Sequence, residues 1–456
     1  MPMRTMLICN RGEIAVRLVR ACRDLGVRSV VAHSAADRDG LAVQLADDAV
    51  CIGPAPADRS YRNVSSILYA AARVGADAVH PGYGFLAEDP RFVSACEEVG
   101  LAFVGPPASV VAGMGDKIAA RAAMREAGVP TLPGTDGPVG SLAEASAAAE
   151  AIGYPVIVKA AAGGGGRGIA VAMDGSELAA AVADASGSAR SLFGDDRVYL
   201  ERYVVGGRHV EVQVLADAHG TVVHLGERDC SVQRRRQKLV EESPSTALDD
   251  ATRQRLLDAA VRGCERIGYR SAGTLEFIVD RAGSPYFLEM NTRLQVEHPV
   301  SELRSGVDIV TAMIAIADGD ALPAELAGVA MRGHAIEVRL NAEDPARQWA
   351  PSAGRISRLR LPAGPGVRVD THLVDGAMVP PFYDSLLAKI IVHAPDRPSA
   401  LRVLRRALGE VECHGITTNL DFHLALLETP EFVAGTHQLD IADSVADRLT
   451  PAATAG

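Results

Sequence analysis

The feature that most constrains the fold is a pair of short apolar segments in the third quarter of the chain. Residues 286–291 alternate apolar and polar side chains, a pattern typical of a half-buried β-strand. Residues 274–280 form a second strand-like segment, and the residues between the two segments favour a turn. The two segments therefore predict a β-hairpin, and a tight turn midway between them would place Glu276 directly across from Glu289.

The two acidic residues of this hairpin create an electrostatic conflict, because opposed carboxylates repel each other unless a cation lies between them. The alternation places Glu289 and Asn291 on one face of the strand, and Leu288 and Met290 on the other. Two carboxylates and an amide oxygen, with no thiol or imidazole nearby to compete, suit Mg²⁺ or Mn²⁺ held between the protein and substrate phosphates. The alternative is an exposed sheet face on which Glu276 and Glu289 are solvated and paired with lysine or arginine.

The same two-residue alternation continues beyond the strand through Arg293, Gln295 and Glu297. A cation, an amide and an acid therefore follow one another on the face that carries the two carboxylates. Such varied chemistry is unusual for a solvated face and favours a reactive site.

The composition limits the class of protein. A chain of 456 residues, 48% of them hydrophobic, is long enough for about three domains. Its formal net charge of −11 argues against nucleic acid or an anionic membrane as the main partner. The seven cysteines form no C-x-x-C pair, which favours reduced thiols. With no apolar run of membrane length and no recognisable signal peptide, we expect a cytoplasmic protein.

The first 113 residues predict a Rossmann-like domain. Apolar segments at residues 6–9 and 29–33 flank a helical pattern over residues 12–25, which indicates the β-α-β unit of a doubly wound sheet. The turn after the first segment has one glycine where a dinucleotide-binding fingerprint needs three, so NAD binding is rejected there. In a later loop two glycines flank Tyr83, which could place its ring at a cleft, or the loop could be a packed turn.

Two lysines stand in places that favour a phosphate. Lys117 precedes a predicted helix at a position where the macrodipole favours anions, so a bound phosphate would remove a penalty; a solvated lysine is the alternative. Lys159 ends a buried strand, and the glycine-rich residues 162–168 lead from it to another strand. Such a loop is not a P-loop but a hairpin whose amides can close over phosphates, or simply a mobile hairpin. We expect it to stay loose until a nucleotide binds.

Three further segments add polar candidates. Residues 198–204 predict a strand that ends in a linker, a common place for an adenine between two lobes. His209 lies on the polar face of the next predicted strand and could contact a nucleotide or be structural. Residues 226–238 contain four arginines and one lysine, which concentrates positive charge where an anionic substrate could sit.

The C-terminal part of the chain predicts a mixed sheet with helices. Within it, Arg339 alternates with apolar neighbours and is a candidate cation that faces inward. A structural ion pair with Glu337 or Glu343 is the alternative.

Taken together, these segments resemble one known family over nearly the whole chain. Six stretches carry the resemblance in the family's order: residues 80–86, 114–117, 159 with 163–168, 227–233, 289–299 and 341–344. The family is the biotin carboxylase component of biotin-dependent carboxylases, which has an ATP-grasp fold. The resemblance implies an α/β fold, with α+β character in the central and C-terminal parts. It divides the chain into a Rossmann-like N-terminal domain (1–113), an ATP-grasp domain (114–330) with a glycine-rich lid at about 131–203, and a large mixed C-terminal domain (331–449).

The resemblance also implies a role for individual residues. ATP would be contacted by Lys117, Lys159, Gly165, Gly166, Glu201, Val204, His209, Gln233, Glu276 and Glu289. The metal ion, Mg²⁺ or Mn²⁺, would be held by Glu276, Glu289 and Asn291. Bicarbonate would be held by Lys238, Arg293, Gln295, Val296 and Glu297, with Glu297 as its base. Biotin would be bound by Arg339 and Tyr83, and the catalytic residues would be Lys238, Arg293, Glu297 and Arg339.

One position departs from the family pattern. Arg236 stands where the family commonly has a histidine that contacts the nucleotide. An arginine there could still reach a ribose or phosphate oxygen, but its protonation does not change near neutral pH.

The activity implied by the resemblance is the ATP-dependent carboxylation of biotin by bicarbonate through carboxyphosphate, the first half-reaction of an acetyl-CoA or acyl-CoA carboxylase. The chain ends without a carrier segment or a carboxyltransferase domain, so we expect biotin on a separate carrier protein, a carboxyltransferase subunit as a further partner, and a homodimer. Two rival hypotheses are another ATP-grasp ligase, which forms an acyl-phosphate for attack by an amine, and a non-catalytic nucleotide-binding regulator.

Overall fold

The computed structural model describes residues 3–162 and 167–449. Gly165 and Gly166, two of the predicted ATP-binding residues, lie outside the described residues, as does the expectation that their loop is loose. Within the described part of the chain, no helix combines the length and the apolar character needed to cross a membrane.

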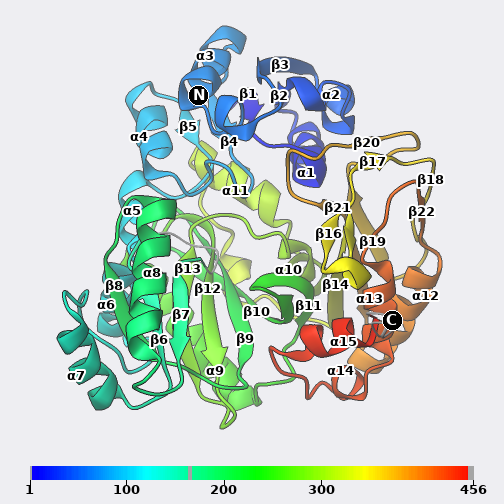
Figure 1. Cartoon of the computed structure of the whole chain (residues 1–456). Coiled ribbons are helices and arrows are strands. Elements are labelled where there is room, and N and C mark those ends of the chain that lie inside the picture. Colours follow the sequence, from blue (N-terminus) through cyan, green and yellow to red (C-terminus); the bar gives the residue numbers. More distant parts are fainter. Residues whose placement is uncertain (1–2, 163–166, 450–456) are drawn as a thin grey trace.

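The N-terminal part is built on a five-stranded parallel sheet in the order β3-β2-β1-β4-β5 (Figure 1). Its strands are β1 (Thr5–Ile8), β2 (Arg28–Ser34), β3 (Asp48–Gly53), β4 (Ala78–His80) and β5 (Ala102–Phe103). Its helices are α1 (Gly12–Asp24), α2 (Leu41–Leu45), α3 (Val64–Val74), α4 (Pro90–Glu98) and α5 (Ala108–Gly115). Strands β1 and β4 are fully buried, as expected of parallel strands covered on both faces. This confirms the predicted doubly wound arrangement.

A smaller antiparallel sheet, β7-β6-β8, forms the region predicted as the lid. Its elements and the helix that precedes them are α6 (Lys117–Glu126), α7 (Leu142–Ile152), β6 (Val156–Ala160), β7 (Ile169–Ala172), α8 (Leu178–Phe193) and β8 (Val198–Arg202). Helices α7 and α8 bury alanine side chains against this sheet, and α8 runs across its face in Figure 1. The two strands that flank the glycine-rich segment pair with each other, so the predicted hairpin is confirmed.

The central and C-terminal parts share one eight-stranded sheet in the order β13-β12-β9-β10-β11-β14-β21-β19. Its strands are β9 (Arg208–Ala216), β10 (Val222–Arg234), β11 (Gln237–Ser243), β12 (Ser271–Val279), β13 (Pro285–Asn291), β14 (His334–Asn341), β19 (Val367–Thr371) and β21 (Leu386–Ala394). Its neighbouring helices are α9 (Asp250–Arg266), α10 (His298–Ser305), α11 (Ile309–Asp318) and α12 (Arg397–Gly409). Because β14 pairs with β11, the sheet continues across the predicted domain boundary at residue 330. The exact domain limits stay a prediction.

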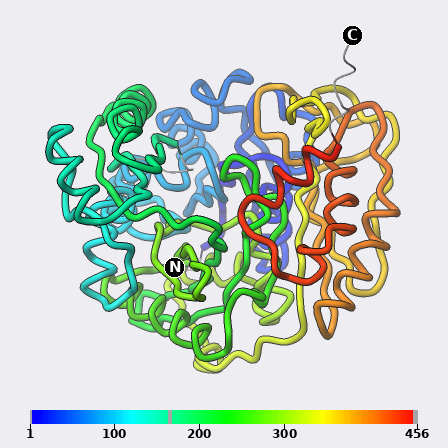
Figure 2. The backbone as a smooth tube through the Cα atoms, turned by 60° about the horizontal axis from the view of Figure 1, so that its bottom comes forward, coloured from blue at the N-terminus to red at the C-terminus, as the bar shows by residue number. Residues whose placement is uncertain are grey.

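The remaining C-terminal elements are short paired strands and further helices. They are β15 (Glu343–Asp344), β16 (Ala350–Pro351), β17 (Gly354–Arg355), β18 (Arg358–Arg360), β20 (Met378–Val379), β22 (Glu412–His414), α13 (Leu420–Leu427), α14 (Pro430–Ala434) and α15 (Ile441–Leu449). Figure 2 shows the orange-to-red C-terminal segment on one side of the green central strands and the teal segment of α7 on the other.

Strands β12 and β13 form the predicted hairpin, and Glu276 lies directly across from Glu289. The predicted distribution of apolar side chains is wrong in one respect, because Phe287 joins Met290 in the core while Leu288 is only partly buried. The pairing skips Leu288, so a β-bulge shifts the alternation by one residue just before Glu289. The bulge leaves the register of the two glutamates as predicted.

Candidate active site

Glu276 lies at the centre of a cluster of polar side chains on β9, β11, β12 and β13. Its Oε1 accepts hydrogen bonds from Lys238 Nζ at 2.9 Å and Asn291 Nδ2 at 2.8 Å, and its Oε2 lies 3.0 Å from His209 Nε2. The residue is 7% exposed, so the alternative is wrong about solvation, although a lysine does pair with the carboxylate. The expectation that no imidazole lies nearby is also wrong, because β9 places His209 beside the carboxylate. Burial alone would raise the pKa of Glu276, but Lys238 and His209 hold it well below its usual range.

The ammonium group of Lys238 lies among three carboxylates. It donates to Glu297 Oε1 at 2.7 Å, to Glu276 Oε1 at 2.9 Å and to Glu211. Glu211 faces Glu276 across β9 and β12, and it also accepts from Arg228 Nε at 2.6 Å. Each of these three buried carboxylates has a cationic partner, which offsets the cost of burying a charge.

The basic segment 226–238 serves two different purposes. Arg228 is fully buried and bound to Glu211, and Arg234 stacks over the Trp349 ring with its guanidinium carbon 5.2 Å from the centroid. Arg228 and Arg234 thus have partners within the protein, and the binding of an anionic substrate by this segment stays a prediction. Lys238 is the member that enters the cluster around Glu276.

The turn between β10 and β11 is formed by Arg235 and Arg236, with φ angles of 48° and 67°. Positive φ is unfavourable for residues other than glycine by about 1–2 kcal/mol each. Positive φ at both central residues is the geometry that a two-residue β-hairpin turn requires, so the hairpin imposes these angles. Arg236, the residue that departs from the family pattern, is the second residue of this turn.

Lys117 lies beside Glu289 and not in solvent. Its Nζ is 3.0 Å from Glu289 Oε2, and its side chain is 9% exposed, so the solvated alternative is wrong. The first turn of α6 is capped by Asp116, whose carboxylate accepts from the backbone N–H groups of Ile118 and Ala119. The carboxylates of Asp116 and Glu289 offset the unfavourable position of a lysine at a helix start.

The predicted metal ligands match Mg²⁺ or Mn²⁺ in their chemistry. Glu276 and Glu289 face each other across the hairpin, and carboxylate oxygens are the donors that hard divalent cations prefer. Asn291 differs from the expectation, because its Nδ2 faces Glu276 while its Oδ1 accepts from Arg293 Nη2 at 3.0 Å. The amide would have to turn over to offer its oxygen, so the fit rests on the two carboxylates.

Glu297 and Arg339 form another part of the cluster. Arg339 Nη2 donates to Glu297 Oε2 at 2.9 Å, and its Nε donates to Glu241 Oε1 at 2.6 Å. The alternative of an ion pair between Arg339 and Glu337 or Glu343 is wrong, because its partners come from β11 and from the residue just before α10. The structure therefore joins the residue predicted to bind biotin to the predicted base.

The acids that bind Arg339 differ in protonation. Burial alone would raise the pKa of Glu297, but Lys238 and Arg339 lower it well below its usual range. Burial raises the pKa of Glu241 to about 7, although Arg339 acts in the opposite direction. Glu297 is thus ionised at neutral pH, whereas Glu241 titrates there.

Arg293 connects the segment after β13 to the N-terminal part of the chain. Its Nε donates to Glu88 Oε2 at 2.8 Å, Nη1 to Gln295 Oε1 at 3.0 Å and Nη2 to Asn291 Oδ1 at 3.0 Å. Gln295 in turn lies 3.4 Å from Glu276 Oε1 through its Nε2. The structure thus brings Arg293, Gln295 and Asn291 together as predicted.

The residues predicted for the nucleotide fall into two groups. Lys159 and Glu201 form a buried ion pair between neighbouring strands β6 and β8. Gln233 Nε2 lies 3.1 Å from His209 Nδ1 on the central sheet, next to the carboxylate cluster. Val204 follows β8 and is half-buried. The contacts of these residues with ATP stay a prediction.

Tyr83 belongs to a packed turn, one of the two alternatives for its loop. Its hydroxyl donates to Glu13, and its backbone carbonyl accepts from Asn10 Nδ2 at 2.7 Å. Gly82 has a φ of 63°, and a Cβ atom there would lie 2.8 Å from Asn10 Nδ2. Because the Asn10 side chain comes so close, position 82 requires glycine.

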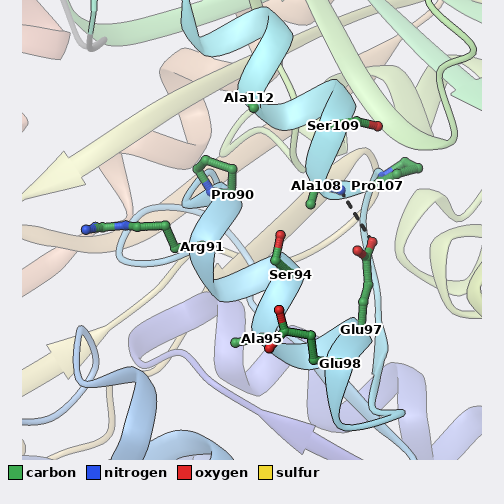
Figure 3. Close-up of a pocket in the computed structure, with 10 residues that line it drawn as sticks. All are labelled: Pro90, Arg91, Ser94, Ala95, Glu97, Glu98, Pro107, Ala108, Ser109 and Ala112. Carbon is green, nitrogen blue, oxygen red and sulfur yellow. Dashed lines mark hydrogen bonds between the residues drawn. The ribbon is translucent and has the colours of Figure 1, made fainter.

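A separate open hollow lies between α4 and the start of α5 (Figure 3). Glu97 Oε1 on its wall accepts from the backbone N–H of Ala108 at 3.4 Å. None of the predicted site residues that the structure describes lines this hollow, so we assign it no part in the chemistry.

Several charged residues near the predicted site residues were not predicted from the sequence. They are Glu88, Glu211, Glu241 and Arg121, and the Nε of Arg121 lies 3.2 Å from Glu201 Oε1. A signal existed for Glu211, because it alternates with His209 on the polar face of β9. Cys230 was also overlooked as a thiol close to Glu211 and Glu297.

Family models match three consecutive segments of the chain. The biotin carboxylase N-terminal domain matches residues 2–111, the ATP-binding domain of the carbamoyl-phosphate synthase L chain matches residues 116–325, and the biotin carboxylase C-terminal domain matches residues 337–443.

Curated relatives and solved structures agree with these matches. The biotin carboxylase of Pseudomonas aeruginosa is 51% identical over 431 residues, which cover 94% of this chain and 96% of that protein. Biotin carboxylase 1 of Bacillus subtilis is 50% identical over 433 residues, covering 95% and 96%. The biotin carboxylase–βγ-ATP complex from Campylobacter jejuni has a TM-score of 0.95 at 44% identity and covers 97% of this chain and 99% of that one. The biotin carboxylase domain dimer of Hydrogenobacter thermophilus 2-oxoglutarate carboxylase, with MgADP, ADP and bicarbonate, has a TM-score of 0.95 at 43% identity, covering 99% and 100%.

The fold and the charged cluster define an ATP-grasp enzyme of the ligase class, with a Rossmann-like N-terminal part as predicted. Identities near 50% over almost the full length of both proteins are far above what a shared fold alone requires. The chain belongs to the biotin carboxylase family.

Proposed function

We propose that this protein uses ATP and bicarbonate to carboxylate biotin on a carrier protein, forming carboxybiotin, ADP and phosphate as the first half-reaction of an acetyl-CoA or acyl-CoA carboxylase. The observation that carries the proposal is the double engagement of Glu297 by Lys238 and Arg339. Nucleotide binding alone needs neither this buried base nor the arginine beside it. A regulator that only senses ATP would therefore have no use for this arrangement.

The nucleotide end of the proposed site is formed by the predicted ATP residues that the structure describes. They are Lys117, Lys159, Glu201, Val204, His209, Gln233, Glu276 and Glu289. Glu276 and Glu289 would hold Mg²⁺ or Mn²⁺, with Asn291 joining them if its amide turned over. A bound divalent cation would supply charge neutralisation for the triphosphate. The lysines add further positive charge on the protein side.

Bicarbonate is a poor electrophile, and phosphorylation makes it an activated mixed anhydride. In the proposed site, Lys238, Arg293 and Gln295 hold the anion together with the backbone at Val296, and Glu297 accepts its proton. The oxygen freed of its proton attacks the γ-phosphorus of ATP, ADP leaves, and carboxyphosphate forms. Positioning and opposite charge supply most of the rate enhancement.

The second step transfers the carboxyl group to biotin. Carboxyphosphate releases CO₂, and the phosphate left behind removes the proton from the ureido nitrogen of biotin. Arg339 stabilises the resulting enolate, and the nitrogen attacks CO₂. Tyr83 would lie on the biotin side, because its hydroxyl is close enough to Arg339 to be influenced by the charge of that residue. The contact between Arg339 and Glu297 supports the two steps occurring at one place.

The proposed assembly is a homodimer that works in the cytoplasm with a separate biotin carrier and a carboxyltransferase subunit. The dimer of the Hydrogenobacter thermophilus domain supports the oligomeric state. The acidic net charge of −11 supports a protein that acts neither on nucleic acid nor at an anionic membrane.

Release of ADP, measured with and without bicarbonate and free biotin, tests the proposed function. We expect release that requires bicarbonate and is stimulated by biotin. An ATP-grasp ligase for another carboxylate would show no such dependence on the two additions. A regulator would bind ATP without bicarbonate-dependent hydrolysis.

A further inference from the structure

Two buried charged residues outside the proposed site connect its biotin side to its bicarbonate side. Lys389 lies on β21, and Glu13 lies in the first turn of α1. Lys389 Nζ is 3.0 Å from Glu13 Oε1 and donates to the backbone carbonyl of Val296 at 2.8 Å. The same oxygen of Glu13 accepts a hydrogen bond from the Tyr83 hydroxyl. A continuous chain of bonds thus runs from Tyr83 to Val296.

The contact with Val296 is the informative part of this chain. Lys389 is fully buried, and besides Glu13 it has Asp370 Oδ2 at 3.7 Å and Glu337 on the neighbouring strand. The ion pairs with Glu13 and Asp370 would be enough to neutralise a structural lysine. Its ammonium nevertheless also binds a backbone carbonyl, and the peptide unit of that carbonyl leads directly into Glu297.

Glu13 makes the corresponding contact on the biotin side. It is 3% exposed, and its Oε2 has no hydrogen-bond partner among the described residues. Its one engaged oxygen is shared by the ammonium of Lys389 and the hydroxyl of Tyr83. Helix α1 packs against β19 and β21, so the carboxylate is held by elements that lie outside the central cluster (Figure 1).

We propose that Glu13 and Lys389 are positioning residues. They hold the Tyr83 loop and the Val296–Glu297 peptide in a fixed position relative to each other, so that biotin lies beside activated bicarbonate. This inference rests on the proposed function. Neither residue touches substrate, and both act through the residues that they hold. If this relative position were lost, activated bicarbonate would decompose in water before it meets biotin. The enzyme would then consume more ATP for each carboxybiotin formed.

The test compares Lys389→Met, Glu13→Gln and the double variant with the unaltered protein. Lys389→Met leaves Glu13 buried without its cation and is expected to lower thermal stability. The double variant removes both charges, and neutral replacement of a buried pair restores most of that stability. It still lacks the donor to Val296. We therefore expect a KM for bicarbonate raised roughly ten- to hundredfold and a higher ratio of ADP to carboxybiotin, with nucleotide affinity unchanged.

Restored stability together with an unaltered KM and an unaltered product ratio would show that the pair is purely structural and would overturn the inference. Two milder variants cover the case in which the double variant fails to fold. Lys389→Arg keeps the charge and should keep the ratio of ADP to carboxybiotin close to normal. Tyr83→Phe removes one hydroxyl and should raise this ratio. An unaltered ratio in Tyr83→Phe would also overturn the inference.

Failure of the inference can be told apart from failure of the proposed function. Unaltered protein that releases no ADP in response to bicarbonate and biotin contradicts the function itself. If the unaltered protein is active and the variants show the same ratio of ADP to carboxybiotin, only the roles of Glu13 and Lys389 are contradicted.

Discussion

Arg339 Nη2 lies 2.9 Å from Glu297 Oε2, so the residue proposed to face biotin is bonded directly to the proposed base for bicarbonate. The other oxygen of Glu297 is bound by Lys238 Nζ at 2.7 Å. Both oxygens of the base are therefore engaged by cations that the reaction uses. Bicarbonate must compete for the same donors, which brings the substrate anion, its base and the acceptor side into one group of side chains.

Replacement of Glu297 tests the base directly. Glu297→Gln keeps the shape of the side chain and one oxygen acceptor but removes the basic group. We expect bicarbonate-dependent ADP release to fall about 10²- to 10⁴-fold, while nucleotide binding measured by calorimetry is retained. Turnover equal to that of the unaltered protein would refute the role of Glu297 as base.

Replacement of Arg339 separates chemistry from stability. Arg339→Ala should abolish biotin carboxylation but retain ATP binding. It also leaves buried Glu241 without its cation and Glu297 with Lys238 alone, which costs on the order of 3–5 kcal/mol in unfolding free energy. Arg397→Ala is a matched control, because Arg397 holds buried Glu242 at 2.7 Å elsewhere in the sheet. If both variants lost activity equally, instability and not the position of Arg339 would be the cause.

Glu241 should give the reaction a measurable pH dependence. The charged groups around it are Arg339, Glu297 and Lys238, with Glu337 across the strand pair. Burial raises the pKa of Glu241 to about 7, so the carboxylate that holds Arg339 forms above that pH. We expect biotin-dependent turnover to fall as pH drops below about 7. Glu241→Gln cannot ionise and should show low turnover without this inflection; persistence of the inflection would assign it to another group.

The raised pKa of Glu241 also has a consequence for stability. A group whose folded pKa exceeds its unfolded value contributes full stability below the unfolded pKa, and this is lost as pH rises through the folded pKa. The contribution of Glu241 should therefore decline between its usual value of 4.5 and about 7. Denaturant unfolding across this range, compared with Glu241→Gln, measures the decline.

Substitutions in the turn at Arg235 and Arg236 separate the effect of backbone strain on stability from a contact between Arg236 and the nucleotide. Glycine tolerates the positive φ of either residue, so Arg235→Gly and Arg236→Gly should each raise the unfolding free energy by about 1 kcal/mol or less. ATP affinity should fall in Arg236→Gly and remain close to normal in Arg235→Gly. Equal affinities in the two variants would exclude a nucleotide contact by Arg236.

Local patterns were sufficient to predict the hairpin and its opposed acids. Strand alternation and a short turn fix which residues of β12 and β13 face each other, so Glu276 and Glu289 could be paired from the sequence. The bulge at Leu288 could not be predicted in this way, because it depends on how Phe287 fits the core. The fold class was accessible for a similar reason, since alternating apolar strands and helical segments indicate a parallel sheet.

The partners of these acids could not be predicted, because they depend on strand order. His209 reaches Glu276 because β9 pairs with β12, although 67 positions separate them in the sequence. Glu88 reaches Arg293 from the N-terminal part of the chain. Lys389 looks like an isolated polar residue in an apolar strand, and no local signal connects it to Glu13 or Val296.

Transfer of carbon from labelled bicarbonate to free biotin tests the account most directly. With ATP and Mg²⁺, we expect acid-labile labelled carboxybiotin to accumulate, and we expect none when either ATP or bicarbonate is omitted or when Glu297→Gln replaces the unaltered protein. Hydrolysis of ATP with no label in biotin under any of these conditions would contradict the assignment of this chain as the enzyme that carboxylates biotin.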